Sequence, residues 1–196
     1  MKIRENHLEP DRFYHIFNRG INSKLTFLNN ENFHFFLRKT KIYILPYFDI
    51  YAYCLMSNHF HFILKVKSEI DLPENFRKTG LHSEACFFSK AISKLMSSYT
   101  QSFNKVYQRS GPVFESPFKR IPIDSEEYLR NLIIYIHQNP DNYQQYKFSS
   151  YLAMISNSET NVQREKVIEL FDDTKNFVEC HQSKDLNINF VKDLKL

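Results

Sequence analysis

The chain has 196 residues, a formal net charge of +4, a sequence pI near 8.8 and an aromatic content of 16%. This length fits one domain of ordinary size, with room for an appended tail. Only three glycines are present, which argues against enzymes that hold a nucleotide in a glycine-rich loop. The basic balance permits an anionic partner, although a solvated basic face is the more common cause of such a charge.

The cysteines and the apolar runs restrict the cellular setting. Cys54, Cys86 and Cys180 are odd in number and form no C-x-x-C spacing, so neither a disulfide framework nor a structural zinc cluster is expected. The N-terminus is polar and charged, and no apolar run approaches the ~18 residues that a membrane helix requires. We therefore expect a cytoplasmic protein with reduced thiols.

The first third of the chain alternates between strand and helix patterns. Residues 12–20 are aromatic and end on a glycine, which indicates an opening strand, and residues 31–45 place apolar side chains at helical spacing before Pro46. Residues 47–55 alternate in polarity, and residues 59–67 do so again after a short polar connection. These two strands are expected to form a hairpin.

The pattern continues with a loop, a long helix, a strand and another helix. The loop is expected at 68–84, an amphipathic helix at 85–108, and an extended basic segment at 109–124, whose two prolines favour a sheet edge. The next helix is capped by Asp124 or Ser125 and ended by Pro140. The first six elements have the β-α-β-β-α-β order of an α+β, ferredoxin-like sandwich, with both helices on one face of an antiparallel sheet.

Two histidines stand out in the fourth predicted element. Alternate residues of a strand project from the same face, so His59 and His61 should lie side by side on a polar face while Phe60 points into the core. Two such imidazoles can share a divalent ion, although strand histidines are more often surface-exposed or hydrogen-bonded. A metal site would need a third protein ligand from elsewhere, and it would keep open positions for substrate oxygens.

The last predicted helix offers that third ligand. Tyr135 and Asn139 are one turn apart and therefore neighbours on the helix surface. Laid across the polar face of the sheet, this helix would bring a phenol and an amide oxygen to the histidines. A helical tyrosine taken alone is more often a packing residue than a nucleophile, so it is the combination with the histidine pair that points to chemistry.

Several motifs, in their order along the chain, resemble those of the single-tyrosine HUH transposases, and most closely those of the REP-associated tyrosine transposases. H-x-H alone is a weak signal, whereas the ordered set is specific. The resemblance covers roughly residues 10–152, which we take as one catalytic domain, followed by a helical and polar extension at 153–196 with a helix near 163–171. The motifs are YHIFNRG (14–20), NHFHF (58–62), SYTQSFNKVYQRSGPVFESPFKR (98–120), EEYLRNLIIYIHQNP (126–140) and FSSY (148–151).

The resemblance implies a role for each of the four candidate residues introduced above. His59 and His61 would bind Mg²⁺ or Mn²⁺, Tyr135 would be the nucleophile, and Asn139 would be a third, polar metal ligand. The implied reaction cleaves and rejoins single-stranded hairpin DNA, such as repeated extragenic palindromes or element ends, through a 5′-phosphotyrosine and without a nucleotide cofactor. The resemblance is compatible with either a monomer or a homodimer.

Basic and aromatic side chains on or near the polar face of the predicted sheet, or at the sheet edge, are candidates for DNA binding. The cations could follow phosphates and the tyrosines could stack unpaired bases, although a solvated face is the more common explanation for any one lysine. The candidates are Lys65, Lys67, Lys119, Arg120, Tyr51 and Tyr53.

Two other hypotheses remain open at this point. The chain could be a non-catalytic, ferredoxin-like module whose aromatic sheet face binds nucleic acid, or a metal-binding regulator without affinity for DNA. If the transposase hypothesis holds, replacing His59 or His61 by alanine should abolish cleavage with little loss of folding, because both are expected on the polar face.

Overall fold

Four antiparallel strands form the centre of the protein, which is described here from a computed structural model over residues 7–73 and 84–183. The strand order is β2-β3-β1-β4, and the helices α1 and α2 follow β1 and β3 in the chain. This confirms the predicted α+β, ferredoxin-like arrangement, with the basic, proline-containing strand at an edge. The strands are β1 (Phe13–Arg19), β2 (Phe48–Met56), β3 (His59–Val66) and β4 (Lys119–Ile123).

The β2–β3 hairpin sets the register of the histidine strand. Met56 pairs with His59, so two residues form the connection. On the other side of β3, His61 pairs with Phe17 of β1. Paired residues of neighbouring strands project from the same face, so the register places β1 side chains directly beside the histidines.

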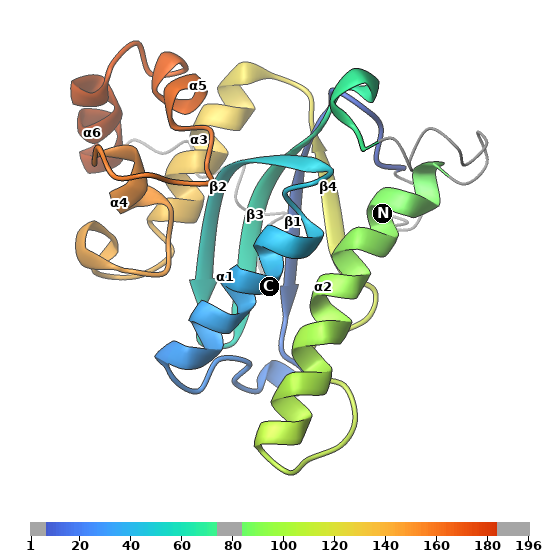
Figure 1. The fold of residues 1–196 in the computed structure, drawn as a ribbon. Coiled ribbons are helices and arrows are strands. Elements are labelled where there is room, and N and C mark those ends of the chain that lie inside the picture. The colour runs from blue at the N-terminus through green and yellow to red at the C-terminus, as the bar shows by residue number, and fades with distance from the viewer. Residues whose placement is uncertain (1–6, 74–83, 184–196) are drawn as a thin grey trace.

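Two helices, α1 (Asn30–Tyr43) and α2 (Glu84–Val106), cover one face of the sheet. Figure 1 shows them side by side in front of the strands. Phe36 of α1 is fully buried, and its ring lies 5.2 Å from that of Phe60. The side chain of Asn29 caps α1 by accepting a hydrogen bond from the backbone N–H of Asn32. Both helices agree with their predicted ranges to within two residues.

The opposite face of the sheet is covered by α3 (Glu126–His137), which Ser125 caps by accepting from the N–H of Tyr128. Leu129, Ile133 and Ile136 are buried, as their helical spacing predicts. The helix covers so much of the sheet that this face is not open. The expectation that His61 projects from an exposed polar face is therefore wrong, because burial by α3 leaves its side chain 0% exposed.

The C-terminal segment packs against the outer edge of β2 and against α3. The backbone N–H of Leu55 donates to the carbonyl of Phe148, and the N–H of Gln163 donates to the carbonyl of Ile50, both at 2.9 Å. The predicted helix near 163–171 is present in shorter form, whereas the last described helix lies in a stretch where only a polar tail was expected. The helices are α4 (Tyr151–Met154), α5 (Arg164–Glu169) and α6 (Thr174–Gln182).

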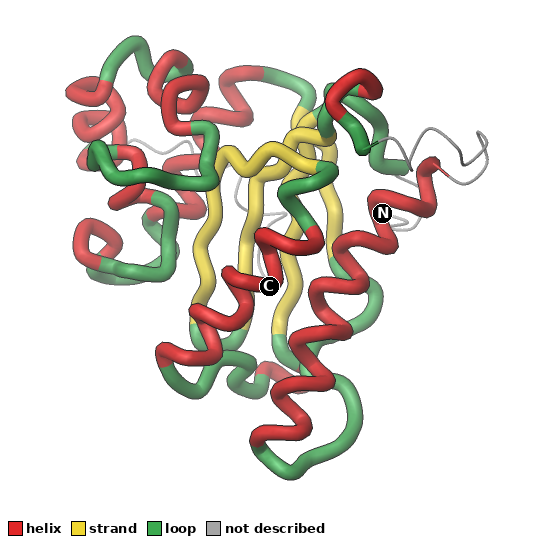
Figure 2. Tube along the Cα trace, in the orientation of Figure 1, coloured by secondary structure: helices red, strands yellow, loops and turns green. Residues whose placement is uncertain are grey.

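Short turns complete the chain trace in Figure 2. The 3-10 helices are η1 (Ile21–Ser23), η2 (Glu69–Asp71) and η4 (Tyr143–Gln145). Most of the loop predicted at 68–84 lies outside the described residues. Within the described ranges, no helix is both long and apolar enough to span a membrane.

Candidate active site

His61 lies beneath α3 near the centre of the sheet, beside a histidine of the neighbouring strand. Its Nδ1 atom is 2.9 Å from Nε2 of His15 in β1, and both side chains are 0% exposed. The ring of Phe17 stacks beside both imidazoles. The other nitrogen of His61, Nε2, is buried and has no hydrogen-bond partner among the described residues. A buried nitrogen of this kind is available to a ligand.

His59 begins β3 and is only partly buried. Its Nδ1 lies 2.7 Å from Oδ1 of Asn58, and its Nε2 lies 3.1 Å from Oδ1 of Asn139. Ligand atoms at neighbouring corners of an octahedral site with 2.1 Å bonds are about 3 Å apart. The nitrogen of His59 and the oxygen of Asn139 are therefore spaced as adjacent ligands of one ion would be.

Tyr135 completes the group from the last turns of α3. Its ring meets that of His61 edge-on, with the centroids 6.2 Å apart. Burial raises the pKa of the phenol, and a hydrogen bond with Asn139 opposes this shift. The structure thus brings together the four residues selected from the sequence, while their catalytic and metal-binding roles stay predictions.

The two histidines of the H-x-H motif are neutral near pH 7. Burial lowers the pKa of His59, and burial together with the neighbouring imidazoles lowers the pKa of His61 well below its usual value. A neutral imidazole keeps a lone pair for a metal, whereas a protonated one does not. Burial therefore favours the neutral form of both imidazoles, which is the form that can bind a metal.

The available donors are two imidazole nitrogens and one amide oxygen. In the part of the chain that the structure describes, no three His, Cys, Asp or Glu side chains are placed so that they could hold one metal ion, so a third protein donor at this site would be the amide of Asn139. The amide oxygen suits Mg²⁺ and Mn²⁺ alike, whereas the imidazole nitrogens suit a transition-metal ion such as Mn²⁺ better than Mg²⁺. The residues fit an exchangeable divalent ion with open positions, and they do not form a closed structural site.

A β-bulge separates the two tyrosines that were candidates for base stacking. Ile50 pairs with Leu64, but Ala52 pairs with the adjacent Ile63, so Tyr51 is the extra residue. The bulge shifts the alternation, and Tyr53 consequently lies beside Phe62 on the α1 face, away from the histidines. The prediction that Tyr51 and Tyr53 share one face is wrong for this reason.

Burial further limits what these tyrosines can bind. Tyr51 is 6% exposed and packs edge-on against Phe13. Burial raises the pKa of each phenol to about 12. Tyr51 therefore offers little ring surface to a base, and we do not retain either residue as a stacking platform for DNA at this site.

The basic candidates point in different directions. Lys119 lies on the α3 side of β4, with Nζ 5.5 Å from the ring centre of Phe17. Lys65 pairs with Asp11 at 3.2 Å, and Lys67 follows β3 and is partly exposed. Of these candidates, Lys119 is the one that lies beside Phe17, whose ring stacks against both buried imidazoles.

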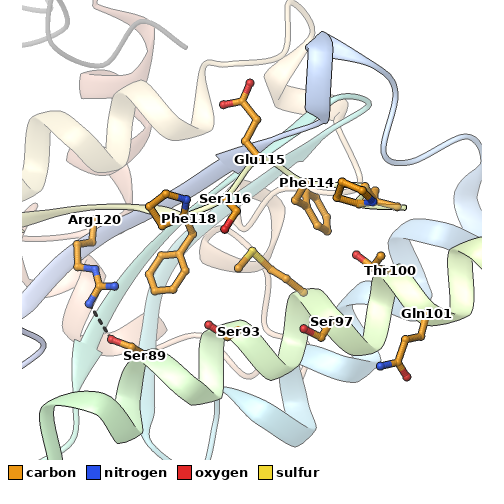
Figure 3. Close-up of a pocket in the computed structure, with 14 residues that line it drawn as sticks. Ser89, Ser93, Ser97, Thr100, Gln101, Phe114, Glu115, Ser116, Phe118 and Arg120 are labelled. Atoms are coloured by element: carbon orange, nitrogen blue, oxygen red, sulfur yellow. Dashed lines mark hydrogen bonds between the residues drawn. The ribbon is translucent and has the colours of Figure 1, made fainter. Parts of the chain in front are cut away.

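Arg120 projects from the other face of the same strand into a groove of about 550 Å³ between α2 and the segment at 112–120. Figure 3 shows Ser89, Ser93 and Ser97 along one side of α2, facing Phe118 and Arg120. Arg120 donates to Oγ of Ser89 at 2.7 Å. This groove and the cluster around Tyr135 are on opposite faces of the sheet, so Arg120 does not reach the histidines.

Comparison with known proteins gives matches among solved structures. No protein-family model matches the chain, and no curated protein matches it significantly. Among solved structures, the chain is similar to a REP-associated tyrosine transposase bound to a REP hairpin, with a TM-score of 0.58 and 14% sequence identity over 79% of this chain and 86% of the other. The fold is that of a REP-associated tyrosine transposase. This agrees with the resemblance found in the sequence motifs.

On this REP-associated tyrosine transposase fold, sequence reasoning missed a second pair of buried histidines behind α3. Nδ1 of His137 lies 2.9 Å from Nε2 of His181 in α6, and Nε2 of His137 lies 2.7 Å from Oγ of Ser150. All three side chains are buried, and Oγ of Ser150 also accepts from the N–H of Tyr53 at 2.9 Å. This buried chain of hydrogen bonds joins α6, α3 and β2.

Sequence reasoning also missed His15, although a signal was present. Phe13, His15 and Phe17 alternate with Tyr14 and Ile16 along β1, which is the period of a strand with two distinct faces. The alternation could have placed His15 on one face of a strand. It could not have shown which strand lies beside it.

Proposed function

We propose that the protein is a metal-dependent nickase and strand transferase for single-stranded hairpin DNA, with Tyr135 as its nucleophile. The observation that supports this proposal is that four side chains lie close together where the end of α3 meets the sheet. They are Tyr135, His59, His61 and Asn139. The transposase fold is compatible with this chemistry, but a fold alone does not determine activity.

The phenolic oxygen of Tyr135 would attack the phosphorus of one phosphodiester. The bond from phosphorus to the 3′ oxygen breaks, that oxygen leaves as a 3′-hydroxyl after taking up a proton, and the 5′ side of the DNA stays joined to Tyr135. A divalent ion held by His59, His61 and Asn139 would polarise the phosphate and offset its negative charge. Attack of the 3′-hydroxyl on the phosphotyrosine reverses the step, so rejoining needs no nucleotide.

The pKa of the Tyr135 phenol predicts how the rate of DNA cleavage depends on pH. A phenol with an ordinary pKa near 10 is almost entirely protonated at pH 7, and burial raises the pKa of Tyr135 further. Losing the phenolic proton is therefore part of the barrier. Cleavage should become faster as the pH rises above 7.

Two observations favour hairpin DNA as the substrate. The solved structure with a similar fold is bound to a REP hairpin. The present chain has a formal net charge of +4, and Lys119 lies beside the histidine cluster on the edge strand. Cations near the reacting group would attract a phosphate backbone in a salt-dependent way.

The test is covalent capture on a pool of single-stranded hairpins with randomised flanks in the presence of Mn²⁺. The DNA is labelled at its 3′ end, because the proposed linkage keeps the fragment 3′ of the cut on the protein. We expect a labelled protein band that survives denaturation in the wild type and is absent in Tyr135→Phe.

Tyr128→Phe in the same helix is the matched control, and it should retain the adduct. If the wild type binds hairpins tightly but gives no adduct on any of them, the proposal fails. The non-catalytic nucleic-acid-binding module then becomes the better description. Metal affinity without any DNA affinity would instead favour the regulator hypothesis.

A further inference from the structure

His15 lies next to the proposed metal site without belonging to the H-x-H motif. It projects from β1 onto the same sheet face as His61, and its Nε2 is 2.9 Å from Nδ1 of His61. Both rings are fully buried, and the ring planes are inclined by 19°. No carboxylate in the described part of the chain is hydrogen-bonded to either ring. The partner that orients His61 is therefore another neutral imidazole.

A hydrogen bond between two neutral imidazoles allows two arrangements of protons. In the first, Nδ1–H of His61 donates to His15, and Nε2 of His61 keeps its lone pair. In the second, Nε2–H of His15 donates to His61, and Nε2 of His61 carries the other proton. Only the first arrangement leaves His61 able to bind a metal through Nε2.

Two buried ring nitrogens of His15 and His61 have no hydrogen-bond partner within the described ranges, and they link the choice between the two proton arrangements to metal binding. Nε2 of His61 and Nδ1 of His15 are both buried and have no hydrogen-bond partner among the described residues. Leaving a buried polar atom without a hydrogen-bond partner is energetically unfavourable. An ion bound to Nε2 of His61 satisfies one of these two atoms, but only in the first arrangement, so metal binding selects it.

The surroundings hold the pair in place. Phe17 stacks 4.4 Å from the ring of His15 and 5.7 Å from that of His61. His15 pairs in register with Ile63 on one side and with Ile121 on the other. Neither ring can therefore turn freely, and the direction of Nε2 of His61 is determined before an ion arrives.

We propose that His15 is a positioning residue that accepts the Nδ1 proton of His61, so that Nε2 of His61 is directed at the ion shared with His59 and Asn139. This inference rests on the metal site of the proposed function. A metal-bound histidine commonly donates its second ring N–H to a carboxylate or a carbonyl. A neutral imidazole polarises the ligand less than a carboxylate does, which suits an exchangeable ion.

The test compares three variants with the wild type by direct Mn²⁺ titration, with electron paramagnetic resonance detecting the free ion. His15→Phe keeps a planar aromatic ring, although a larger one, and removes the acceptor, and we expect its Mn²⁺ affinity to fall by about 10- to 100-fold. His15→Gln supplies an amide oxygen that can accept from His61, and it should recover most of the affinity. Thr40→Val removes a buried hydrogen bond on the other side of the sheet, and it should leave the affinity unchanged.

A second measurement needs no substitution. Nitrogen NMR of the histidine rings, recorded with saturating Mg²⁺, should show His61 protonated at Nδ1 and not at Nε2. This readout keeps the inference testable even if His15→Phe fails to fold.

The outcomes separate the inference from the proposed function. If the wild type binds Mn²⁺ and folded His15→Phe binds it equally well, His15 is only a packing residue and the inference is overturned. The opposite tautomer of His61 in the metal-bound protein would overturn it too. If the wild type binds no Mn²⁺ at millimolar concentration, the metal site of the proposed function fails, and the inference fails with it.

Discussion

His61 has a structural role as well as a proposed chemical one. Its ring is surrounded by α3, Phe17 and His15, whereas His59 is at the beginning of the same strand and partly exposed. Two residues of one motif therefore differ in burial. For this reason, they should differ in their effects on stability even if they bind the same ion.

Alanine substitutions should separate the two histidines in the metal-free protein. His61→Ala leaves a cavity beneath α3 and removes the hydrogen-bond partner of His15, so we expect a loss of about 2–4 kcal/mol in the free energy of unfolding. His59→Ala should cost less than about 1 kcal/mol. Urea denaturation in the presence of a chelator measures both values, and equal losses would contradict the burial argument.

At the scale of elements, α3 packs both against the sheet and against the C-terminal segment. The sheet supports one side of it, and His137 at its end is hydrogen-bonded to His181 of α6 and to Ser150, which precedes α4. Phe177 of α6 is fully buried, and its ring is 5.9 Å from that of His137. The C-terminal extension thus packs directly against the helix that carries Tyr135.

Truncating Phe177 tests this contact. Phe177→Ala should lower the free energy of unfolding by about 3–5 kcal/mol, because a large aromatic side chain leaves a cavity between α6 and α3. Backbone amides at the end of α3 should then exchange with solvent faster. Lys175→Ala in the same helix is the control, since this side chain is 83% exposed, and it should change stability by less than about 0.5 kcal/mol. Unchanged exchange in α3 would show that α6 does not hold this helix.

At the scale of the whole molecule, four histidines among the described residues are buried, and they form two hydrogen-bonded pairs, His15 with His61 and His137 with His181. Burial lowers the pKa of His15 to about 3 and that of His181 to about 4, and it lowers the pKa values of His61 and His137 as well. Each of these side chains takes up a proton more readily in the unfolded chain, where the pKa is near 6.5. Acid therefore favours the unfolded state through all four.

The metal-free protein should consequently lose stability as the pH falls from 6.5 towards 4. Above pH 6.5 the unfolded chain gains no extra protons at these sites, so the stability is fully present there. At pH 4 the contribution of His181 alone amounts to about 3 kcal/mol. Denaturant midpoints measured between pH 6.5 and pH 4 test whether the stability falls as the pH falls. His34→Ala at an exposed position should leave the slope unchanged, and a midpoint that does not fall with pH would contradict the prediction.

The local pattern of residues was sufficient for the order of the strands and α-helices as far as α3, and it selected the residues of the candidate site. Strand alternation placed His59 beside His61, and helical spacing placed Tyr135 beside Asn139, because both relations depend only on the geometry of one element. The edge position of β4 followed from its prolines. The same reasoning failed at Tyr51, where one extra residue in the strand reversed the alternation.

The sequence by itself determined the order of the elements as far as α3, which side chains share a face within β3 and α3, and the similarity to REP-associated tyrosine transposases. Only the tertiary structure decided that His61 is buried, that His15 is its partner, and that His181 joins α6 to α3. The physical reason is that these contacts join residues 46 and 44 positions apart. Strand register and helix packing fix such contacts, and no periodicity within a single element encodes them.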